Sequence, residues 1–194
     1  TTQSIIVNQP GTYTVTVKNV YNNFSCDASK DFIVTNSGPP TIIDIATSDW
    51  SPTNNSAVIT ATGSGTYLYS LDNVNFQTSN TFNNLLPGFY TAYVKDENGC
   101  GKANEDFVLL NYPKYFTPNG DGYNDTWQIR FSTFEPNLNI DIFDRFGKFL
   151  IRLRGGDSGW DGTYNGQDVF STDYWFVVTR EDGKIYKGHF SLKR

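Results

Sequence analysis

A short pattern that occurs twice constrains the fold of this chain more than any other sequence feature. Residues 10–19 read PGTYTVTVKN, and residues 87–96 read PGFYTAYVKD, 77 residues later. A cysteine follows each copy, and then an Asp-Phe pair with two apolar residues. Each copy predicts a turn, an alternating strand, a loop and a closing strand. This order is typical of the last two strands of an immunoglobulin-like sandwich, present as a repeated module.

The repeat divides the chain into three parts. Residues 1–36 are predicted to supply the C-terminal strands of a truncated immunoglobulin-like repeat, and residues 37–111 a complete repeat. Ser37-Gly38-Pro39-Pro40 is the predicted linker, stiffened by its prolines. Residues 112–194 are predicted to be a separate C-terminal domain. No segment has the 3.6-residue apolar period of a helix. The predicted fold class is therefore all-β, with tandem immunoglobulin-like β-sandwiches ending in a C-terminal β-sandwich.

Alternation of apolar and polar residues predicts the strands of each part. In the first part we expect strands at residues 4–7, 12–18 and 32–35. In the second part we expect them at 41–46, 57–62, 67–70, 81–82, 90–95 and 107–110. In the third part we expect them at 128–131, 138–143, 148–153, 174–180 and 184–192. Phe146-Gly147, Asn165-Gly166 and Asp182-Gly183 mark turns, and the last predicts a two-residue hairpin.

Charge and hydropathy argue against two classes of function. The net charge is −5, and it comes from residues 1–111, where four Lys or Arg face nine Asp or Glu. From Tyr112 onward the counts are eleven each. Nucleic-acid binding needs a concentrated basic surface, which this distribution does not favour. No apolar run approaches the roughly 20 residues that cross a bilayer. The lack of a signal peptide and of Met favours a piece of a longer protein with its export signal upstream.

The two cysteines are not predicted to form a disulfide with each other. Cys26 and Cys100 fall at corresponding points of consecutive modules. Such points lie about a module length apart, which exceeds the distance that a disulfide can bridge. Each could instead pair with another cysteine of a longer protein or stay free.

The segment from Tyr112 to Trp127 is predicted to be a tightly specified loop. It reads YPKYFTPNGDGYNDTW, with two residues each of Pro, Gly, Asn and Asp between aromatic flanks. Gly120 and Gly122 can adopt positive φ at little cost, and Asn or Asp side chains close turns onto their own backbone. We therefore expect a fixed entry turn into the C-terminal domain.

The same loop contains part of a calcium-binding pattern. Asn119, Asp121 and Asp125 imitate the alternating oxygen ligands of a calcium loop, with Gly122 after the third ligand position. Thr117 and Gln128 stand where carboxylates would be, which removes negative charge that calcium needs. The alternative is a loop held by its own hydrogen bonds without metal. No other cofactor is expected.

We expect no enzymatic activity. His189 is the only histidine, and the alternation of its strand places it on the outer face, away from a triad or metal cluster. Asp157 and Asp161 could be imagined as a glycosidase pair, but shaping the loop around Trp160 is the simpler interpretation. Core packing is the prediction for Trp160 and Trp175, and Trp50 is a candidate for surface contact.

Several C-terminal motifs together resemble a known family. Phe116-Thr117-Pro118-Asn119-Gly120-Asp121-Gly122, followed by Asn124-Asp125, resembles the signature of the type B C-terminal sorting domain of the Bacteroidetes type IX secretion system. This family is also called the gliding-motility-associated C-terminal domain. Residues 141–148 (DIFDRFGK), 160–166 (WDGTYNG), 174–178 and 186–192 resemble its later blocks in the same order. The segment FSTD at 170–173 departs from the family's Pro-Ala-Gly-Thr-like turn.

The resemblance covers about residues 112–194 and carries functional implications. It implies a targeting signal for export across the outer membrane, recognised by type IX secretion components such as an SprF/PorP-type outer-membrane protein. It also implies display on the cell surface, as in a gliding adhesin like SprB. Residues 67–72 and 85–90 resemble the adhesin repeats that precede such domains. The expected partner contacts are Phe116, Thr117, Pro118, Asn119, Gly120, Asp121, Gly122, Asn124, Asp125, Trp160, Asp161 and Gly162.

Two other functions stay open from the sequence. The last domain could be a calcium-assisted carbohydrate-binding adhesive module that grips surface polysaccharide. The chain could also belong to a glycosidase whose accessory part ends in the same sorting tail. Export of a fused reporter favours the sorting function, whereas glycan retention by the domain favours the adhesive one.

Overall fold

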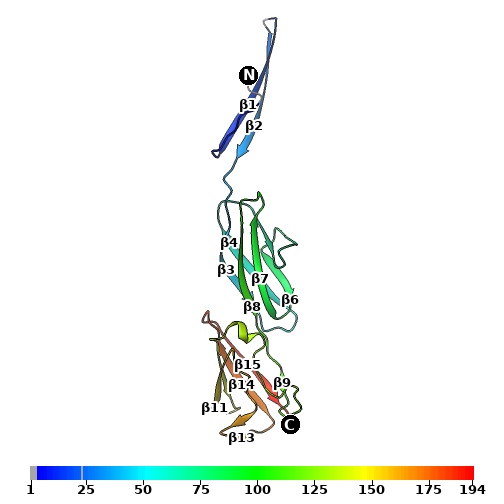
Figure 1. The fold of residues 1–194 in the computed structure, drawn as a ribbon, viewed down its shortest axis with the longest axis vertical. Helices are drawn as coiled ribbons and strands as arrows, with labels where there is room; N and C mark the ends of the chain where they lie inside the picture. The colour runs from blue at the N-terminus through cyan, green and yellow to red at the C-terminus, as the bar shows by residue number, and fades with distance from the viewer. Residues whose placement is uncertain (1–3, 23) are drawn as a thin grey trace.

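The computed structural model describes residues 4–22 and 24–194, and these residues form an all-β structure with one short 3-10 helix. A long hairpin, a β-sandwich and a C-terminal domain follow one another along the long axis of the molecule (Figure 1). The predicted all-β fold class is confirmed. Within the described ranges, no helix is long and apolar enough to cross a membrane.

The first part is a hairpin of β1 (Gly11–Tyr21) and β2 (Phe24–Val34). Most side chains on both of its faces are exposed. The predicted strand at residues 4–7 is wrong. A β-strand needs a hydrogen-bonded neighbour, and in this part of the described chain β1 and β2 pair only with each other. Cys26 lies within β2, whereas Cys100 lies in a loop after a strand, and both are exposed.

The second part is a sandwich of two three-stranded sheets. One sheet has the order β3 (Thr41–Ser48), β4 (Asn55–Thr62), β6 (Thr81–Leu85). The other has the order β5 (Tyr67–Ser70), β7 (Gly88–Asp96), β8 (Lys102–Leu109). Ile59, Ala92 and Val94 are fully buried between them. All six predicted strands are present, with ends shifted by a few residues.

The hairpin β1–β2 and the hairpin β7–β8 share their register and their side-chain bonds. Gly11 pairs with Val34 as Gly88 pairs with Leu109. The Thr14 hydroxyl donates to Asp31 at 2.7 Å, and the Thr91 hydroxyl donates to Asp106 at 2.7 Å. The tyrosine hydroxyl of each first strand also donates to the carbonyl four residues earlier, at 2.8 Å and 2.9 Å. The repeated sequence pattern therefore folds the same way twice.

The C-terminal domain is built on a five-stranded sheet. Its order is β11 (Phe149–Arg154), β10 (Asn139–Phe143), β14 (Asp173–Thr179), β15 (Ile185–Leu192), β9 (Tyr115–Phe116). Only β9 runs parallel to its neighbour. A small hairpin of β12 (Thr163–Tyr164) and β13 (Gln167–Asp168) and the 3-10 helix η1 (Ser132–Phe134) complete the domain.

The predicted strand at residues 128–131 is wrong. This segment makes only isolated bridges at its ends, from Trp127 to Trp160 and from Arg130 to Asn111. Phe131 has a φ of 65°, in the left-handed region, and it turns the chain directly into η1. A residue in that conformation cannot continue an extended strand. Alternation alone did not reveal this turn.

The turns of the C-terminal domain follow two different designs. Asn165 and Gly166 both have positive φ and join β12 to β13 as a two-residue hairpin turn. At Asp182-Gly183 the predicted two-residue hairpin is wrong. Arg180 N donates to Lys184 O at 2.9 Å, so three residues form the connection, with Gly183 in the left-handed region.

The core of the C-terminal domain is rich in aromatic rings and lies on one face of the five-stranded sheet. Trp127 stacks on Phe190 with ring centroids 3.8 Å apart, and Trp160 meets Tyr174 edge to face at 5.0 Å. The core prediction for Trp160 is confirmed, since this residue is 1% exposed. The same prediction for Trp175 is wrong, because its parity in β14 puts it on the opposite face, where it is 43% exposed.

Candidate functional site

The candidate site is the loop from Thr117 to Asp125, and the sheet fixes where it begins. Ser191 N donates to Lys114 O at 2.9 Å, and Lys193 N donates to Phe116 O at 3.0 Å. These bonds attach β9 to β15, and the Phe116 ring is fully buried. The loop therefore leaves the domain from an anchored residue.

The far end of the loop is anchored in the same way. Trp127 and Trp160 exchange two backbone hydrogen bonds of 2.8 Å and 2.9 Å. Thr117 N donates to Asn124 O at 2.8 Å and closes the base of the loop. The chain is thus held in place on both sides of the loop. Because the loop is short and closed, it loses little further conformational entropy when a partner binds.

The carboxylate of Asp125 organises the interior of the loop. It accepts hydrogen bonds from the backbone N–H groups of Asn119 at 3.0 Å, Gly120 at 2.8 Å and Gly122 at 2.7 Å. The bonds from Gly120 and Gly122 lower the pKa of Asp125 below its ordinary value, because they stabilise the ionised form. Three amides from one short turn thus face the same carboxylate and form a compact nest around it.

Asp121 makes a second, smaller set of bonds at the tip. It accepts from the Asn119 side-chain amide at 2.8 Å and from Tyr123 N at 2.8 Å. Its own N–H donates to Asn119 Oδ1 at 3.1 Å, which is the turn geometry expected of Asn and Asp. Gly120 and Gly122 have φ of 77° and 84°, as the sequence predicted.

The tip of the loop is open to solvent. Residues 119–124 are all exposed, and the Tyr123 side chain is 75% exposed. A Cβ atom added at Gly120 or Gly122 would meet nothing within 4 Å. The loop is therefore rigid in its backbone and free on its surface, which suits recognition by another molecule.

The structure accounts for the loop without a metal ion. The oxygens of Asn119, Asp121 and Asp125 already accept hydrogen bonds from within the loop. Among the described residues, no group of three or more His, Cys, Asp or Glu side chains could hold a metal ion. Calcium at Asn119, Asp121 and Asp125 stays a prediction, and the ligands would have to keep or exchange these bonds when the ion binds.

The block Trp160-Asp161-Gly162 lies beside the core rather than beside the loop tip. Trp160 Nε1 donates to Thr163 O at 2.7 Å, and Asp161 accepts from Thr163 N at 2.9 Å. Gly162 has a φ of 79°, and a Cβ there would come within 2.7 Å of Leu192. Arg194 donates to Gly162 O at 3.0 Å and so ties the last residue to this block.

The predicted partner contacts therefore separate into two groups. The side chains of Phe116 and Trp160 lie in the core, and Gly162 is buried. In the folded domain these residues cannot touch a partner through their side chains, and we omit them from the surface proposed below. The exposed or half-exposed group is Thr117, Pro118, Asn119, Gly120, Asp121, Gly122, Asn124, Asp125 and Asp161.

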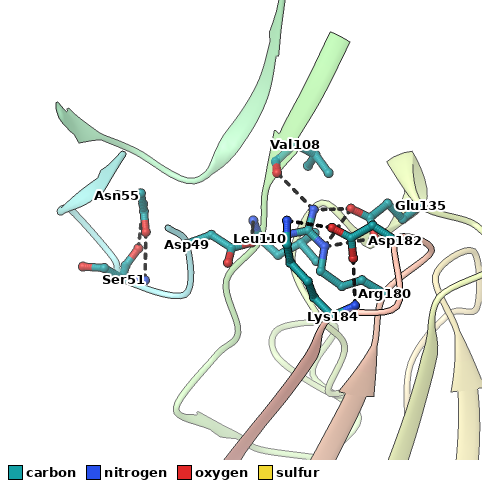
Figure 2. A network of polar contacts seen from close by, with 9 residues as sticks. All are labelled: Asp49, Ser51, Asn55, Val108, Leu110, Glu135, Arg180, Asp182 and Lys184. Atoms are coloured by element: carbon teal, nitrogen blue, oxygen red, sulfur yellow. Dashed lines mark hydrogen bonds and ion pairs between the residues drawn. The ribbon is translucent and has the colours of Figure 1, made fainter. Parts of the chain in front are cut away.

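A buried ionic network joins the C-terminal domain to the preceding sandwich (Figure 2). Arg180 donates to Asp49 at 2.7 Å, forms an ion pair with Glu135 and reaches the carbonyl of Val108 at 3.3 Å. Asp49 also accepts from Leu110 N at 3.2 Å. The side chains of all three charged residues are at most 13% exposed.

Burial and pairing act on these groups in opposite directions. Desolvation raises the pKa of Asp49, and the positive charge of Arg180 only partly offsets it. Burial acts to lower the pKa of Arg180, but its bond to Glu135 and the charges of both acids produce a net rise. Arg180 is therefore permanently charged, with two carboxylates competing for it.

Aromatic contacts reinforce this junction. Trp50, with a φ of 77°, stacks on Tyr186 with centroids 4.2 Å apart, and Phe89 stacks on Phe134 at 4.5 Å. The prediction of a surface contact for Trp50 is wrong, because its ring packs against the C-terminal domain. Sequence reasoning missed the junction, since its partners are up to 131 residues apart and no motif links them.

Comparison with known families identifies the C-terminal domain. Residues 110–192 match the family model of the CHU_C type IX secretion signal domain. This part of the chain therefore belongs to the type IX secretion signal domains, in agreement with the resemblance of its motifs. No curated protein matches the chain.

Solved structures give only distant similarity. Dimeric latent PorU from Porphyromonas gingivalis is 12% identical over 94% of this chain and 30% of that chain, with a TM-score of 0.28. SGBP-B of the Bacteroides ovatus mixed-linkage glucan utilization locus is 16% identical over 81% and 48%, with a TM-score of 0.27. The titin I-band fragment I67–I69 is 15% identical over 95% and 74%, also with a TM-score of 0.27. The chain thus spans less than a third of the PorU structure and about half of the SGBP-B structure, and likeness at this level supports no functional conclusion.

Proposed function

We propose that the chain is the C-terminal part of a secreted cell-surface adhesin of a gliding member of the Bacteroidetes. Outer-membrane export components recognise its last domain as a type IX targeting signal and deliver the protein across the outer membrane. The match of residues 110–192 to the signal-domain family is the observation that carries this proposal. The repeated hairpin geometry in the preceding part supports a stalk of similar modules.

The proposed recognition element is the exposed face of the loop from Thr117 to Asp125, together with the exposed Asp161, which follows Trp160, the backbone partner of Trp127. Its backbone is already fixed by the bonds to Asp125, so a partner would not have to order it on binding. The proposed partner is an SprF/PorP-type outer-membrane protein. The protein acts by being recognised and displayed, and we assign it no catalytic role.

An export assay tests this proposal. The full chain is fused to the C-terminus of a fluorescent reporter that carries a signal for crossing the inner membrane. It is expressed in a type IX-proficient bacterium and in the same strain without the outer-membrane translocon. We expect surface-exposed or released reporter only in the proficient strain. Retention in the periplasm of both strains would contradict the targeting function.

A loop variant tests the recognition element in the same assay. Asp121→Ala with Asp125→Ala removes both acceptors that shape the loop, so the reporter should accumulate in the periplasm. Glu97→Ala with Glu105→Ala, which removes two exposed acids of the preceding sandwich, serves as the matched control. Normal surface display of the double variant would remove the loop from the proposal.

A further inference from the structure

The five-stranded sheet has a second, solvent-facing side that carries a row of aromatic residues. Phe143 is paired directly with Phe149 on one neighbour strand and with Trp175 on the other, and Trp175 is paired with His189. Directly paired residues point to the same side of a sheet. These four residues cross β11, β10, β14 and β15, and we call them the aromatic row.

The side chains of the aromatic row are partly exposed to solvent and do not belong to the core of the domain. Phe149 is 48% exposed and Trp175 is 43% exposed, whereas Tyr174 and Phe176, which flank Trp175 in β14, are buried on the other side. The rings already contact each other, with centroids of Phe143 and Phe149 at 5.9 Å and of Trp175 and His189 at 6.3 Å. Large aromatic side chains grouped on a surface mark a contact site more often than single ones do.

The charged residues around the aromatic row carry an excess of positive charge. Arg152 pairs with Asp141 at 2.6 Å, and Asp173 accepts a hydrogen bond from Ser191. Lys187 lies on the same side in β15 and forms no ion pair with a described residue. Lys193 follows it at the edge, above the Tyr115 ring at 4.4 Å. Arg152, Lys187 and Lys193 thus stand against Asp141 and Asp173, and the resulting excess of one positive charge favours an acidic partner.

The ring geometry distinguishes between a glycan and a protein as that partner. The planes of Phe143 and Phe149 differ by 70°, and those of Trp175 and His189 differ by 35°. Successive sugar rings would need a flat aromatic platform, and this row does not provide one. Side chains that stand at different angles suit insertion into pockets of a protein surface, where Trp and other aromatic residues dominate the binding energy.

We propose that the aromatic row is a docking surface for an acidic protein surface with an apolar pocket, carried by an outer-membrane component of the export apparatus. The row is continuous with the loop, because Tyr115 of β9 is paired with Ser191 on this side of the sheet and Thr117 follows one residue beyond β9. The partner would therefore contact the loop and the row together. This inference rests on the proposed targeting function.

The export assay with the full chain also tests this surface. Trp175→Thr with Phe149→Thr removes both exposed rings and keeps residues that favour strands. We expect surface reporter to fall at least about tenfold, the change expected when aromatic hot-spot residues are truncated. Val74→Thr with Leu86→Thr, which are 77% and 58% exposed in the preceding sandwich, is the matched control and should be exported normally.

A charge variant covers the case in which the aromatic variant folds poorly. Lys187→Glu with Lys193→Glu deletes no apolar contact of the core, and melting of the purified protein should stay within about 3 °C of the original, as exposed substitutions usually do. Export should still fall, because the acidic partner would be repelled. Export of both variants at the original level would overturn the inference and leave the targeting function intact.

Two further outcomes separate the alternatives. If the unsubstituted chain is not exported in the proficient strain, the targeting function itself fails, whatever the row does. Purified chain is also tested for retention on alginate, an anionic polysaccharide. Retention that depends on Trp175, together with normal export of the Trp175→Thr, Phe149→Thr variant, would overturn the protein partner in favour of a glycan.

Discussion

Asp125 and Asp121 lie four residues apart in the same loop, but they hold different parts of it. Asp125 accepts three backbone amides from the turn that precedes it, whereas Asp121 accepts from Tyr123 N and from the side chain of Asn119. The ring of amides around Asp125 encloses the backbone, and the bonds of Asp121 cap the tip. Loss of Asp125 should therefore loosen the whole loop, and loss of Asp121 only its tip.

The loop should consequently respond to acid through Asp125. Its pKa in the folded state lies below the ordinary value of 3.8, so the ionised group favours the folded state above that value. This contribution is lost as pH falls through the lower folded-state pKa. We expect Asp125→Asn to melt below the original protein at pH 5 to 7, with the difference shrinking below about pH 4. Thermal melts across this range measure it, and a constant difference at all pH values would contradict the assignment.

Alanine substitutions at Gly162 and Gly166 distinguish the cost of a steric clash from the cost of a left-handed backbone conformation. Their φ values are 79° and 76°, but a Cβ at Gly162 would lie 2.7 Å from Leu192, whereas one at Gly166 would meet nothing within 4 Å. Gly166→Ala should cost about 1–2 kcal/mol from the left-handed conformation alone. Gly162→Ala should cost about 1–3 kcal/mol more, because the core around Leu192 must move. Urea unfolding of both variants provides the measurement, and equal losses would show that the contact is relieved easily.

At the scale of strands and turns, the parts that the sequence predicted are those with long alternation. The six strands of the sandwich and four of the long strands of the C-terminal domain follow directly from this pattern. The strands β9, β12 and β13 have only two residues each, too few for any alternation to be recognised. Trp175 was misassigned because both sides of β14 carry large apolar residues, so the pattern alone did not show which side is covered.

The junction between the sandwich and the C-terminal domain depends on a charge network that can be dissected. Folded Asp49 has a raised pKa, so its contribution to stability is present below pH 3.8 and is lost as pH rises through the folded-state value. A neutral side chain of the same shape should therefore be tolerated at pH 7. Asp49→Asn should change the free energy of unfolding by less than about 1 kcal/mol, since its oxygen can still accept from Arg180 and Leu110.

Removal of the whole acceptor should behave differently. Asp49→Ala leaves the Leu110 amide without its partner and Arg180 with Glu135 alone, and both are buried. We expect a loss of about 2–4 kcal/mol in urea unfolding, as for other broken buried pairs. A loss as small as that of Asp49→Asn would mean that water or Glu135 replaces the acceptor.

At the scale of the whole molecule, the sandwich and the C-terminal domain share apolar contacts. Val108 and Leu110, which end the sandwich, belong to the core of the C-terminal domain, and Trp50 packs against it. We expect both parts to unfold together in a single calorimetric transition. Trp50→Ala with Phe89→Ala should split it into two, because these rings supply the stacking across the junction. Tyr21→Ala with Phe24→Ala, at the exposed end of the first hairpin, is the control, and two transitions in the original protein would contradict the prediction.

The sequence predicted the turn chemistry of the candidate site, but not which of its residues are exposed or which other residues lie beside it. The turn-forming residues of the loop indicated Asx geometry and positive φ at Gly120 and Gly122, and both are present. The threefold role of Asp125, the burial of Phe116 and the aromatic row depend on which strands become neighbours. Those pairings arise from contacts between distant residues, which local patterns do not encode.

The parallel pairing of β9 with β15 determines how the domain would respond to mechanical load. Tension applied between Tyr112 and Arg194 would draw these two strands past each other in opposite directions. The bonds from Ser191 N to Lys114 O and from Lys193 N to Phe116 O lie across that direction, so both would have to break at once. If the chain is displayed on the cell surface as proposed, a pull from outside the cell would therefore meet resistance from this strand pair before the domain opens from its ends.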